Sequence, residues 1–396
     1  MLSYQKIVNK LMPLKKLTRN MKYQICTKTV MDTSDSRIAF DSNGVCDHAL
    51  DFYKNVMPNW HTGEVGKNKL ASIVNKIKVD GKNRDFDCIL GLSGGVDSSY
   101  MLHLAVKEFG LRPLVFHVDG GWNSELAVHN IQVMVDRLNL DLYTEVINWE
   151  EMKEFQLAWL KSGVPHIDIP QDHAFIATLY KFAEKYNIKY ILNGGNISTE
   201  CVRNPLEFFY YGTDILHIND ILNKFSNARL KTYPFSSIFR HKIYLRFFRG
   251  IKVIRPLNYR PYIKSEAVKI LQQEYEWRPY PQKHFESRFT RFYEGYWLPK
   301  RFGFDPRRVQ FSSLILTGQM TRSEAIRELE MSSYDSLTIN QEFEYIATKL
   351  GITVNELEEY FHLPKKFYWN YKNMVSIFNM GAKILKKVGF ETSIKR

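Results

Sequence analysis

Two glycines, three serines and an aspartate stand together at residues 93–99, in the sequence SGGVDSS. Glycine lets a backbone approach a phosphate group closely, and serine hydroxyls and backbone N–H groups donate hydrogen bonds to its oxygens. An apolar run, FDCILGL, precedes the segment and an amphipathic run, SYMLHLAVKEFG, follows it, so its amides would lie at a helix start, where anions are favoured. We therefore predict a phosphate-binding loop. Its candidate binding residues are Ser93, Gly94, Gly95, Ser98 and Ser99.

This loop differs from the two common phosphate-binding motifs. It contains no lysine and fits neither G-x-x-x-x-G-K-[ST] nor G-x-G-x-x-G, so neither a Walker NTPase nor a Rossmann dehydrogenase is supported. A flexible Gly/Ser linker is disfavoured because a predicted strand and a predicted helix flank the segment. Asp97 is a hard oxygen ligand that can hold Mg²⁺ against phosphates, and its alternative role is a capping carboxylate at the helix start.

A second group of charged residues lies far along the chain, in the sequence PQKHFESRFTRF at residues 281–292. Such a density of charge can bind pyrophosphate, a sugar carboxylate or an adenylate. Lys283 is a candidate electrostatic clamp, and His284 or Glu286 is a candidate proton acceptor. The alternative is a solvated basic helix face. The group comprises Lys283, His284, Glu286, Arg288 and Arg291.

An alternation of strands and helices after residue 85 would position both groups. Short apolar runs predict strands at residues 86–92, 112–119, 141–147, 189–194 and 252–259. Apolar residues at helical spacing predict helices at residues 99–110, 123–140, 172–187 and 264–277, the second with Asn123 as its N-cap. This order predicts an α/β fold with a parallel sheet, in which ligands bind beyond the carboxyl ends of the strands. Residues 26–60 indicate hairpins and loops, and the chain after Asp305 indicates helices.

Composition sets broader limits. The chain has 396 residues, 44% of them hydrophobic, and a net charge of +13. The charge favours polyanions without choosing among nucleic acid, anionic lipid and a phosphorylated substrate. No uninterrupted apolar run is long enough to span a membrane and no signal peptide is evident, so we expect a cytoplasmic protein. The four cysteines are too sparse for a disulfide framework.

The sequence SGGVDSS resembles the pyrophosphate loop of the PP-loop ATPases, which have an adenine nucleotide alpha hydrolase-like fold. The resemblance implies that the chain binds ATP and Mg²⁺ and splits ATP into AMP and pyrophosphate to adenylate a substrate. It also implies that the end of the second strand lies beside the adenosine and that the loop NGGN closes on the nucleotide. These positions are His117, Val118 and Asp119, and Gly194, Gly195 and Asn196.

A closer resemblance, to the N-acetyl sugar amidotransferase family, covers most of the chain. It rests on CTKTVMDTSD, FDSNGVCDH, HVDGGWNS, NGGNISTE and KHFESRFTRFYEGYWLPKRFGFDPRR with SSLILTGQMTR. It implies conversion of the acetamido group of a sugar or sugar nucleotide to an acetamidino group, in the synthesis of surface polysaccharide (lipopolysaccharide O-antigen) or of nonulosonic acids such as pseudaminic acid. It favours the cluster at residues 283–288 as a catalytic site. We expect an N-terminal extension and knuckle-like segment at 1–75, the PP-loop domain at 76–280 and a helical substrate- or partner-binding region at 281–396.

Family members often carry two C-x-x-C pairs, the layout of a structural zinc site, in the N-terminal segment. Here Thr29 and Ala49 replace the second cysteine of each pair and leave Cys26 and Cys46. With Asp47 and His48 as the remaining possible ligands, we expect a knuckle held by packing and no closed zinc site. Cys88 reads as a small buried hydrophobe, and Cys201 as a spectator thiol after the NGGN loop.

The nitrogen donor is the remaining part of the chemistry. Ammonia is mostly ammonium at neutral pH, so such enzymes usually receive it through a channel from a glutaminase. None of the four cysteines is flanked by the glycines of a nucleophile elbow, and the chain begins with Met1 and Leu2. We expect partner subunits, which the resemblance identifies as a glutaminase and a cyclase-like protein similar to the histidine-biosynthesis pair.

Two other functions stay open. A PP-loop enzyme acting on tRNA, such as a lysidine synthetase, also adenylates a carbonyl and would explain the basic charge. The CTKTVMD and KHFESRFTRF segments favour a sugar substrate, so we do not expect nucleic acid as a partner. An inactive nucleotide-sensing or assembly subunit is the other alternative, and the intact SGGVDSS argues against it.

Overall fold

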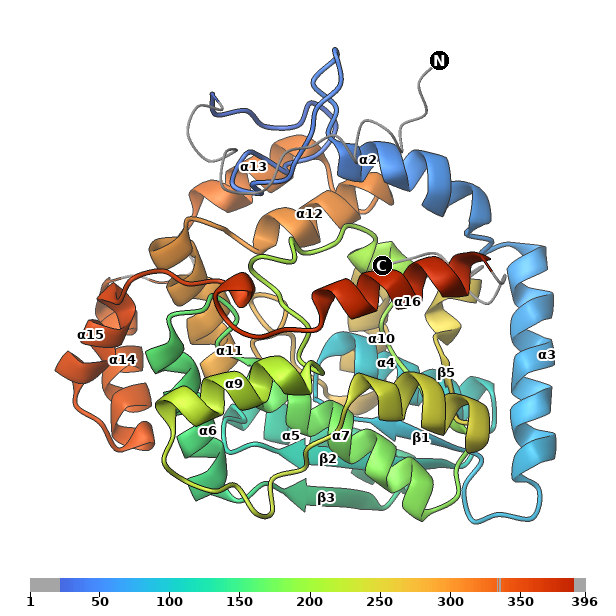
Figure 1. Cartoon of the computed structure of the whole chain (residues 1–396). Coiled ribbons are helices and arrows are strands. Elements are labelled where there is room, and N and C mark those ends of the chain that lie inside the picture. Colours follow the sequence, from blue (N-terminus) through green and yellow to red (C-terminus); the bar gives the residue numbers. More distant parts are fainter. Residues whose placement is uncertain (1–21, 333, 335, 388–396) are drawn as a thin grey trace.

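The computed structural model describes residues 22–332, 334 and 336–387. Its centre is a five-stranded parallel sheet in the order β3-β2-β1-β4-β5 (Figure 1). Because β1 pairs with both β2 and β4, the strand order reverses at β1, and the carboxyl end of such a strand is a usual ligand site. The strands are β1 (Cys88–Gly91), β2 (Pro113–Asp119), β3 (Leu142–Val146), β4 (Tyr190–Leu192) and β5 (Lys252–Ile254).

Helices cover both faces of the sheet. Ile89 of β1 packs in one apolar cluster with Phe155 and Trp159. Its neighbour Leu90 packs in another with Met101, because successive side chains of a strand point to opposite faces. Both faces are therefore dry, which explains the continuous apolar runs of the strands. One layer is α4 (Val96–His103), α5 (Glu125–Leu138) and α10 (Lys264–Tyr275), and the other is α6 (Trp149–Ser162), α7 (Ile169–Lys185) and α9 (Ile215–Phe225).

The α/β fold predicted from the sequence is confirmed. Each predicted strand contains an observed one, and the four predicted helices correspond to α4, α5, α7 and α10. The predicted N-cap of α5 is one residue too early: the side chain of Ser124 accepts the hydrogen bond from the Ala127 N–H at 3.1 Å. The amide of Asn123 instead donates to Asp119 at 3.1 Å and holds the loop after β2.

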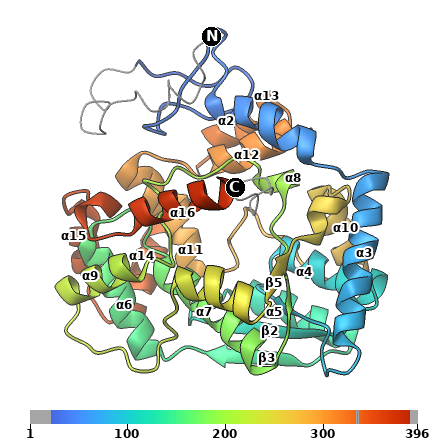
Figure 2. The same cartoon turned by 45° about the vertical axis from the view of Figure 1, so that its right-hand side comes forward.

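The N-terminal segment packs on the C-terminal region as well as on itself. Its expected extension, residues 1–21, lies outside the described residues. Cys26 and Cys46 belong to an apolar cluster that includes Phe289 and Phe304. The guanidinium of Arg322 donates to two carbonyl groups of the segment at 3.1 and 3.0 Å. In both views the segment lies over α12 and α13 (Figures 1 and 2), which explains how a stretch with few periodic runs keeps a fixed structure.

Two helices of the N-terminal part were not foreseen as such. Residues 26–60 are not only hairpins and loops, because α2 (Asp47–Asp51) and two further short helical turns follow Cys46. The long helix α3 (Glu64–Gly81) buries only a narrow apolar stripe that includes Leu70 and Ile77, so its sequence pattern is weak.

The C-terminal region is helical, as predicted (Figure 2). Among residues 22–332, 334 and 336–387, no helix combines the length and the apolar character that crossing a bilayer requires. The helices not yet named are α8 (Ile197–Glu200), α11 (Arg288–Phe292), α12 (Arg307–Leu316), α13 (Arg322–Glu330), α14 (Ser336–Leu350), α15 (Val354–His362) and α16 (Val375–Lys387).

Candidate active site at the phosphate loop

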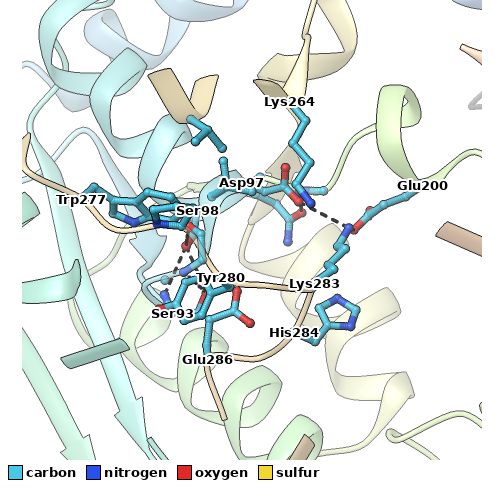
Figure 3. A pocket seen from close by; sticks show the side chains of 18 of the residues that line it. Ser93, Asp97, Ser98, Glu200, Lys264, Trp277, Tyr280, Lys283, His284 and Glu286 are labelled. Carbon is cyan, nitrogen blue, oxygen red and sulfur yellow. Dashed lines mark hydrogen bonds and ion pairs between the residues drawn. The ribbon is translucent and has the colours of Figure 1, made fainter. Parts of the chain in front are cut away.

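The predicted phosphate loop connects β1 to the first turn of α4. Gly94 has φ +84°, a conformation that favours glycine, and its carbonyl accepts hydrogen bonds from Trp277 Nε1 at 3.0 Å and Tyr280 OH at 3.3 Å. The Ser93 and Ser98 hydroxyls lie 3.1 Å apart and close the loop on itself. The backbone is thus held from outside by residues that follow α10, with its serine hydroxyls at the cavity (Figure 3).

A cavity of about 270 Å³ opens beside this loop. Most of its walls come from four parts of the chain: the loop after β1 with the start of α4, the loop after β4 with α8, the start of α10 and the segment that precedes α11. The polar lining residues are Ser93, Asp97, Ser98, Asn193, Glu200, Lys264, Tyr280, Gln282, Lys283, His284 and Glu286.

Lys283 joins the two predicted groups of residues. Its ammonium lies 2.6 Å from Glu200 Oε1 and 3.4 Å from Asp97 Oδ2, so two carboxylates converge on one cation (Figure 3). The side chains of the three residues are 12–25% exposed, which makes this pairing stronger than one in open solvent. Although Lys283 is far from the phosphate loop in sequence, it contacts Asp97 in the helix that the loop begins.

Asp97 is also held on its other oxygen. Oδ1 accepts a hydrogen bond from Tyr262 OH at 2.5 Å and from Asn196 Nδ2 at 3.3 Å. Asn196 in turn caps α8 through its own oxygen, which accepts from the Thr199 N–H at 2.8 Å. Asp97 itself does not cap α4, whose N-cap is Gly95. The carboxylate is therefore oriented toward the cavity by residues of three separate loops.

Glu286 lies directly against the phosphate loop. A Cβ atom added to Gly95 would collide with its carboxylate, so this carboxylate covers the glycine backbone that a phosphate would approach. Burial raises the pKa of Glu286. Its position is fixed through the backbone, because its carbonyl accepts from the Ser124 N–H at 2.9 Å and the next residue, Ser287, forms an antiparallel bridge with Asn123.

His284 pairs with a buried carboxylate at the edge of the cavity. Its Nδ1 lies 3.0 and 3.1 Å from the two oxygens of Glu294. Burial disfavours the imidazolium, but the Glu294 charge outweighs it and raises the pKa of His284 to about 9. His284 also has φ +65°, which costs free energy for a residue with a Cβ and turns the chain sharply between Lys283 and Glu286.

The cavity also has a lysine that the sequence analysis did not single out. Lys264, at the start of α10, lines the cavity near Asp97 (Figure 3). Burial lowers its pKa. Lys264, Tyr262, Glu200, Trp277 and Tyr280 were all missed. Two signals were available: residues that follow a strand of a parallel sheet face the ligand edge, and Glu200 ends the quoted motif NGGNISTE.

Three residues that we expect beside the adenosine lie at the end of β2, the strand next to β1. The His117 ring lies 2.9 Å from the Leu92 carbonyl, and burial lowers its pKa. Val118 is buried and Asp119 accepts a hydrogen bond from the Gly121 N–H at 2.8 Å. None of the three is among the described residues that line the cavity, so their contact with adenosine stays a prediction.

Some of the remaining predicted residues line the cavity and others do not. Gly194 and Gly195 line the cavity, and a Cβ on Gly194 would lie 2.6 Å from the Asp97 carbonyl oxygen, so only glycine fits there. Ser99 is fully buried inside α4. Arg288 points away from the cavity: it pairs with Glu342 at 3.0 Å, and its guanidinium carbon lies 3.4 Å from the centre of the Tyr345 ring.

The cysteines lie apart from this site. Cys26 and Cys46 are buried together, with the Cys46 N–H donating to Cys26 Sγ at 3.2 Å, and the hydrogen bond from the Cys46 thiol lowers the pKa of Cys26 to about 5. Burial raises the pKa of Cys201 to about 11, and that of Cys88 as well. In the part of the chain that the structure describes, no group of three or more His, Cys, Asp or Glu side chains is arranged to hold a metal ion.

Two family models match the chain, one in each half. Residues 87–195 match the phosphoadenosine phosphosulfate reductase domain, which covers β1 to β4 and the phosphate loop. Residues 286–385 match the C-terminal domain of WbpG-like proteins of lipopolysaccharide biosynthesis, and this match begins at Glu286. None of the curated proteins matches the chain in sequence.

Solved structures show only weak similarity. The NMN synthetase of Francisella tularensis is 16% identical, with a TM-score of 0.27 over 56% of this chain and 98% of that one. The U34-tRNA thiolase NcsA of Methanococcus maripaludis is 13% identical, with a TM-score of 0.30 over 87% of this chain and 91% of that one. These scores are too low to support a conclusion, so classification rests on the two family models and the sheet. The chain therefore combines a PP-loop type of nucleotide-binding domain with a C-terminal region that matches the WbpG-like proteins of lipopolysaccharide biosynthesis.

Proposed function

We propose that this protein is an ATP-dependent, AMP-forming amidotransferase that converts the acetamido group of a sugar to an acetamidino group in lipopolysaccharide or nonulosonic acid synthesis. One observation carries the proposal: Lys283, from the segment that leads into the WbpG-like domain, bridges Asp97 and Glu200 beside a phosphate loop that has no lysine of its own. The site therefore combines the nucleotide-binding domain with the segment that leads into the WbpG-like match.

The chemistry explains the need for ATP. The acetamido oxygen attacks the α-phosphorus of ATP and pyrophosphate leaves, which turns a poor leaving group into AMP. Ammonia then adds to the carbon, its nitrogen loses a proton, and the C–O bond breaks to release AMP and the amidine. Lys283 and Lys264 lie where they can stabilise negative charge on the phosphates.

The proton acceptor in this scheme is Glu286. His284, the other candidate, carries a proton at neutral pH because Glu294 raises its pKa to about 9, so it serves as a cation. Burial raises the pKa of Glu286, which makes its carboxylate a stronger base than an exposed one. Glu286 must leave Gly95 when phosphates bind there, and it then lies beside the reacting groups.

Asp97 and Glu200 fit a magnesium ion bound together with nucleotide phosphates. Mg²⁺ is commonly held by one or two carboxylates plus phosphate oxygens, and these two carboxylates already converge on one cation. The metal would neutralise charge on the leaving pyrophosphate. Asp97 and Glu200 would hold it, and Lys283 would pair with the phosphates.

The nitrogen source in this proposal is a glutaminase partner, bound with a cyclase-like subunit. At neutral pH only about one part in a hundred of ammonia is unprotonated, so a channelled supply has a large advantage in effective concentration. The purified chain should use glutamine only after its partner is added. Without the partner, it should use ammonium salts, and only at alkaline pH. Glutamate and amidine formed from glutamine by the chain alone would contradict this part.

The reaction class is tested by the nucleotide product. With ATP, acetamido sugars and ammonium, we expect AMP and pyrophosphate by ion-exchange chromatography, and ADP with phosphate would refute the proposal. Asp97→Asn keeps the side-chain shape but removes its charge, so we expect at least about a tenfold loss of turnover. Asp51→Asn, at an exposed position at the end of α2, is the matched control, and its turnover should be unchanged. Equal turnover of Asp97→Asn and wild type would remove Asp97 from the site.

A further inference from the structure

A second cavity, of about 530 Å³, adjoins the one at the phosphate loop. The two cavities share three lining residues, Glu200, Lys283 and His284. A ligand in the second cavity would therefore lie next to the nucleotide site, with Lys283 lining both cavities. Its volume falls within the range of about 300–1,000 Å³ that is usual for small-molecule sites.

Several carboxylates line this second cavity. Glu207 is 5% exposed, and its two oxygens accept from the Ser36 N–H at 3.0 Å and the Ser36 hydroxyl at 2.6 Å. Asp35 is 4% exposed and pairs with His48 at 2.8 Å. Asp47 accepts a hydrogen bond from the Ala39 N–H. These groups are oriented by hydrogen bonds while they line the cavity, and each carboxylate oxygen has lone pairs for a further hydroxyl donor.

The rest of the lining adds cations and aromatic rings. Arg37 and Arg203 line the same cavity, and Arg37 is oriented by a hydrogen bond to Tyr368 OH at 3.0 Å. Phe209 and Tyr211 present aromatic side chains. Carboxylates accept hydrogen bonds from hydroxyl groups, aromatic rings pack on the C–H faces of a sugar, and guanidinium groups bind anions. Together these groups suit a sugar that carries a phosphate or a carboxylate.

We infer that this second cavity is the acceptor site, which binds an acetamido sugar with its hydroxyls on Asp35, Asp47 and Glu207 and an attached anion on the arginines. This inference rests on the proposed function and adds a location and a ligand class to it. It gives the N-terminal segment, residues 35–48, a direct part in substrate binding. A long nucleic acid would bring phosphates against three fixed carboxylates, so the cavity disfavours RNA.

The test measures sugar binding without catalysis. Saturation-transfer NMR and calorimetry would be used with N-acetylglucosamine, UDP-N-acetylglucosamine and UDP-glucose, and the non-hydrolysable analogue α,β-methylene-ATP would report on the nucleotide site. We expect Asp47→Asn and Glu207→Gln to weaken binding of both acetamido probes by about tenfold or more, because each loses a charged hydrogen-bond acceptor. Arg203→Ala should weaken binding of the UDP-sugar more than that of the free sugar.

Matched controls separate this inference from the proposed function. None of the three substitutions should change the affinity for α,β-methylene-ATP or the melting temperature, and Asp51→Asn should bind sugar as wild type does. Sugar binding that is insensitive to all three substitutions, or no binding of any probe to the wild type, would overturn the acceptor site. Sensitive sugar binding without AMP formation would keep the site and refute the proposed reaction instead.

Discussion

We expect Glu294→Gln to lower the pKa of His284 by at least about one pH unit. In the wild-type protein, burial disfavours the imidazolium, but Glu294 lies 3.0 Å from Nδ1 and raises the pKa of His284 to about 9. The substitution keeps the side-chain shape and removes the largest influence that raises the pKa of His284. Partial burial and the Lys283 charge then pull that pKa back toward its ordinary value of about 6.5, against the smaller opposing effect of Glu286.

Exposure limits the size of this effect. The His284 side chain is 44% exposed, so solvent screens part of its attraction to Glu294. We therefore expect at least about one pH unit, or about 1.4 kcal/mol, and not the full difference between 9 and 6.5. Because the folded-state pKa is raised, the pair contributes all of its stability below about pH 6.5, and this contribution is lost as the pH rises through about 9.

The measurement is an NMR titration between about pH 5 and about pH 10, with carbon-13 at the histidine Cε1 position. His284→Gln identifies the resonance. Chemical denaturation of wild type and Glu294→Gln gives the second readout, and their difference in unfolding free energy should shrink between neutral and alkaline pH. A wild-type His284 that titrates near pH 6.5, or an equal His284 pKa in both proteins, would refute the ion pair with Glu294 as the cause of a raised pKa. Either result would restore His284 as a candidate base.

Three further substitutions probe the site and its surroundings. Gly95→Ala places its Cβ against the movable end of the Glu286 side chain, so we expect the melting temperature to change by less than about 2 °C. Calorimetry should show at least about a tenfold loss of ATP affinity. Retained affinity would mean that phosphates do not approach Gly95. Arg288→Ala leaves the buried Glu342 unpaired, and denaturant titration should show a loss of about 3 kcal/mol with the KM for ATP unchanged. Lys283→Ala should instead lower ATP turnover by about 100-fold in steady-state assays, and an equal effect of the two substitutions would contradict the separation of Lys283 from Arg288.

Local pattern was enough to predict the sheet and the phosphate loop. The strands are buried on both faces and therefore read as continuous apolar runs, and the helices between them carry an apolar face at helical spacing. The glycines and serines of the loop stand directly between β1 and α4, so their place at the carboxyl end of the central strand follows from the order of elements. Helix α3, with a narrow buried stripe, had no comparable signal.

The tertiary structure alone decided which charged residues act together. Lys283 and Arg288 are close in sequence, yet Lys283 pairs with Asp97 in the cavity and Arg288 pairs with Glu342 outside it. The left-handed backbone of His284 and the bridge between Ser287 and Asn123 send the two side chains in different directions. The second cavity likewise joins residues 35–48 to 199–211, although neither stretch shows a pattern that identifies the other as its neighbour. Contacts between such distant segments depend on how the N-terminal loops and C-terminal helices pack into one core, which no local periodicity encodes.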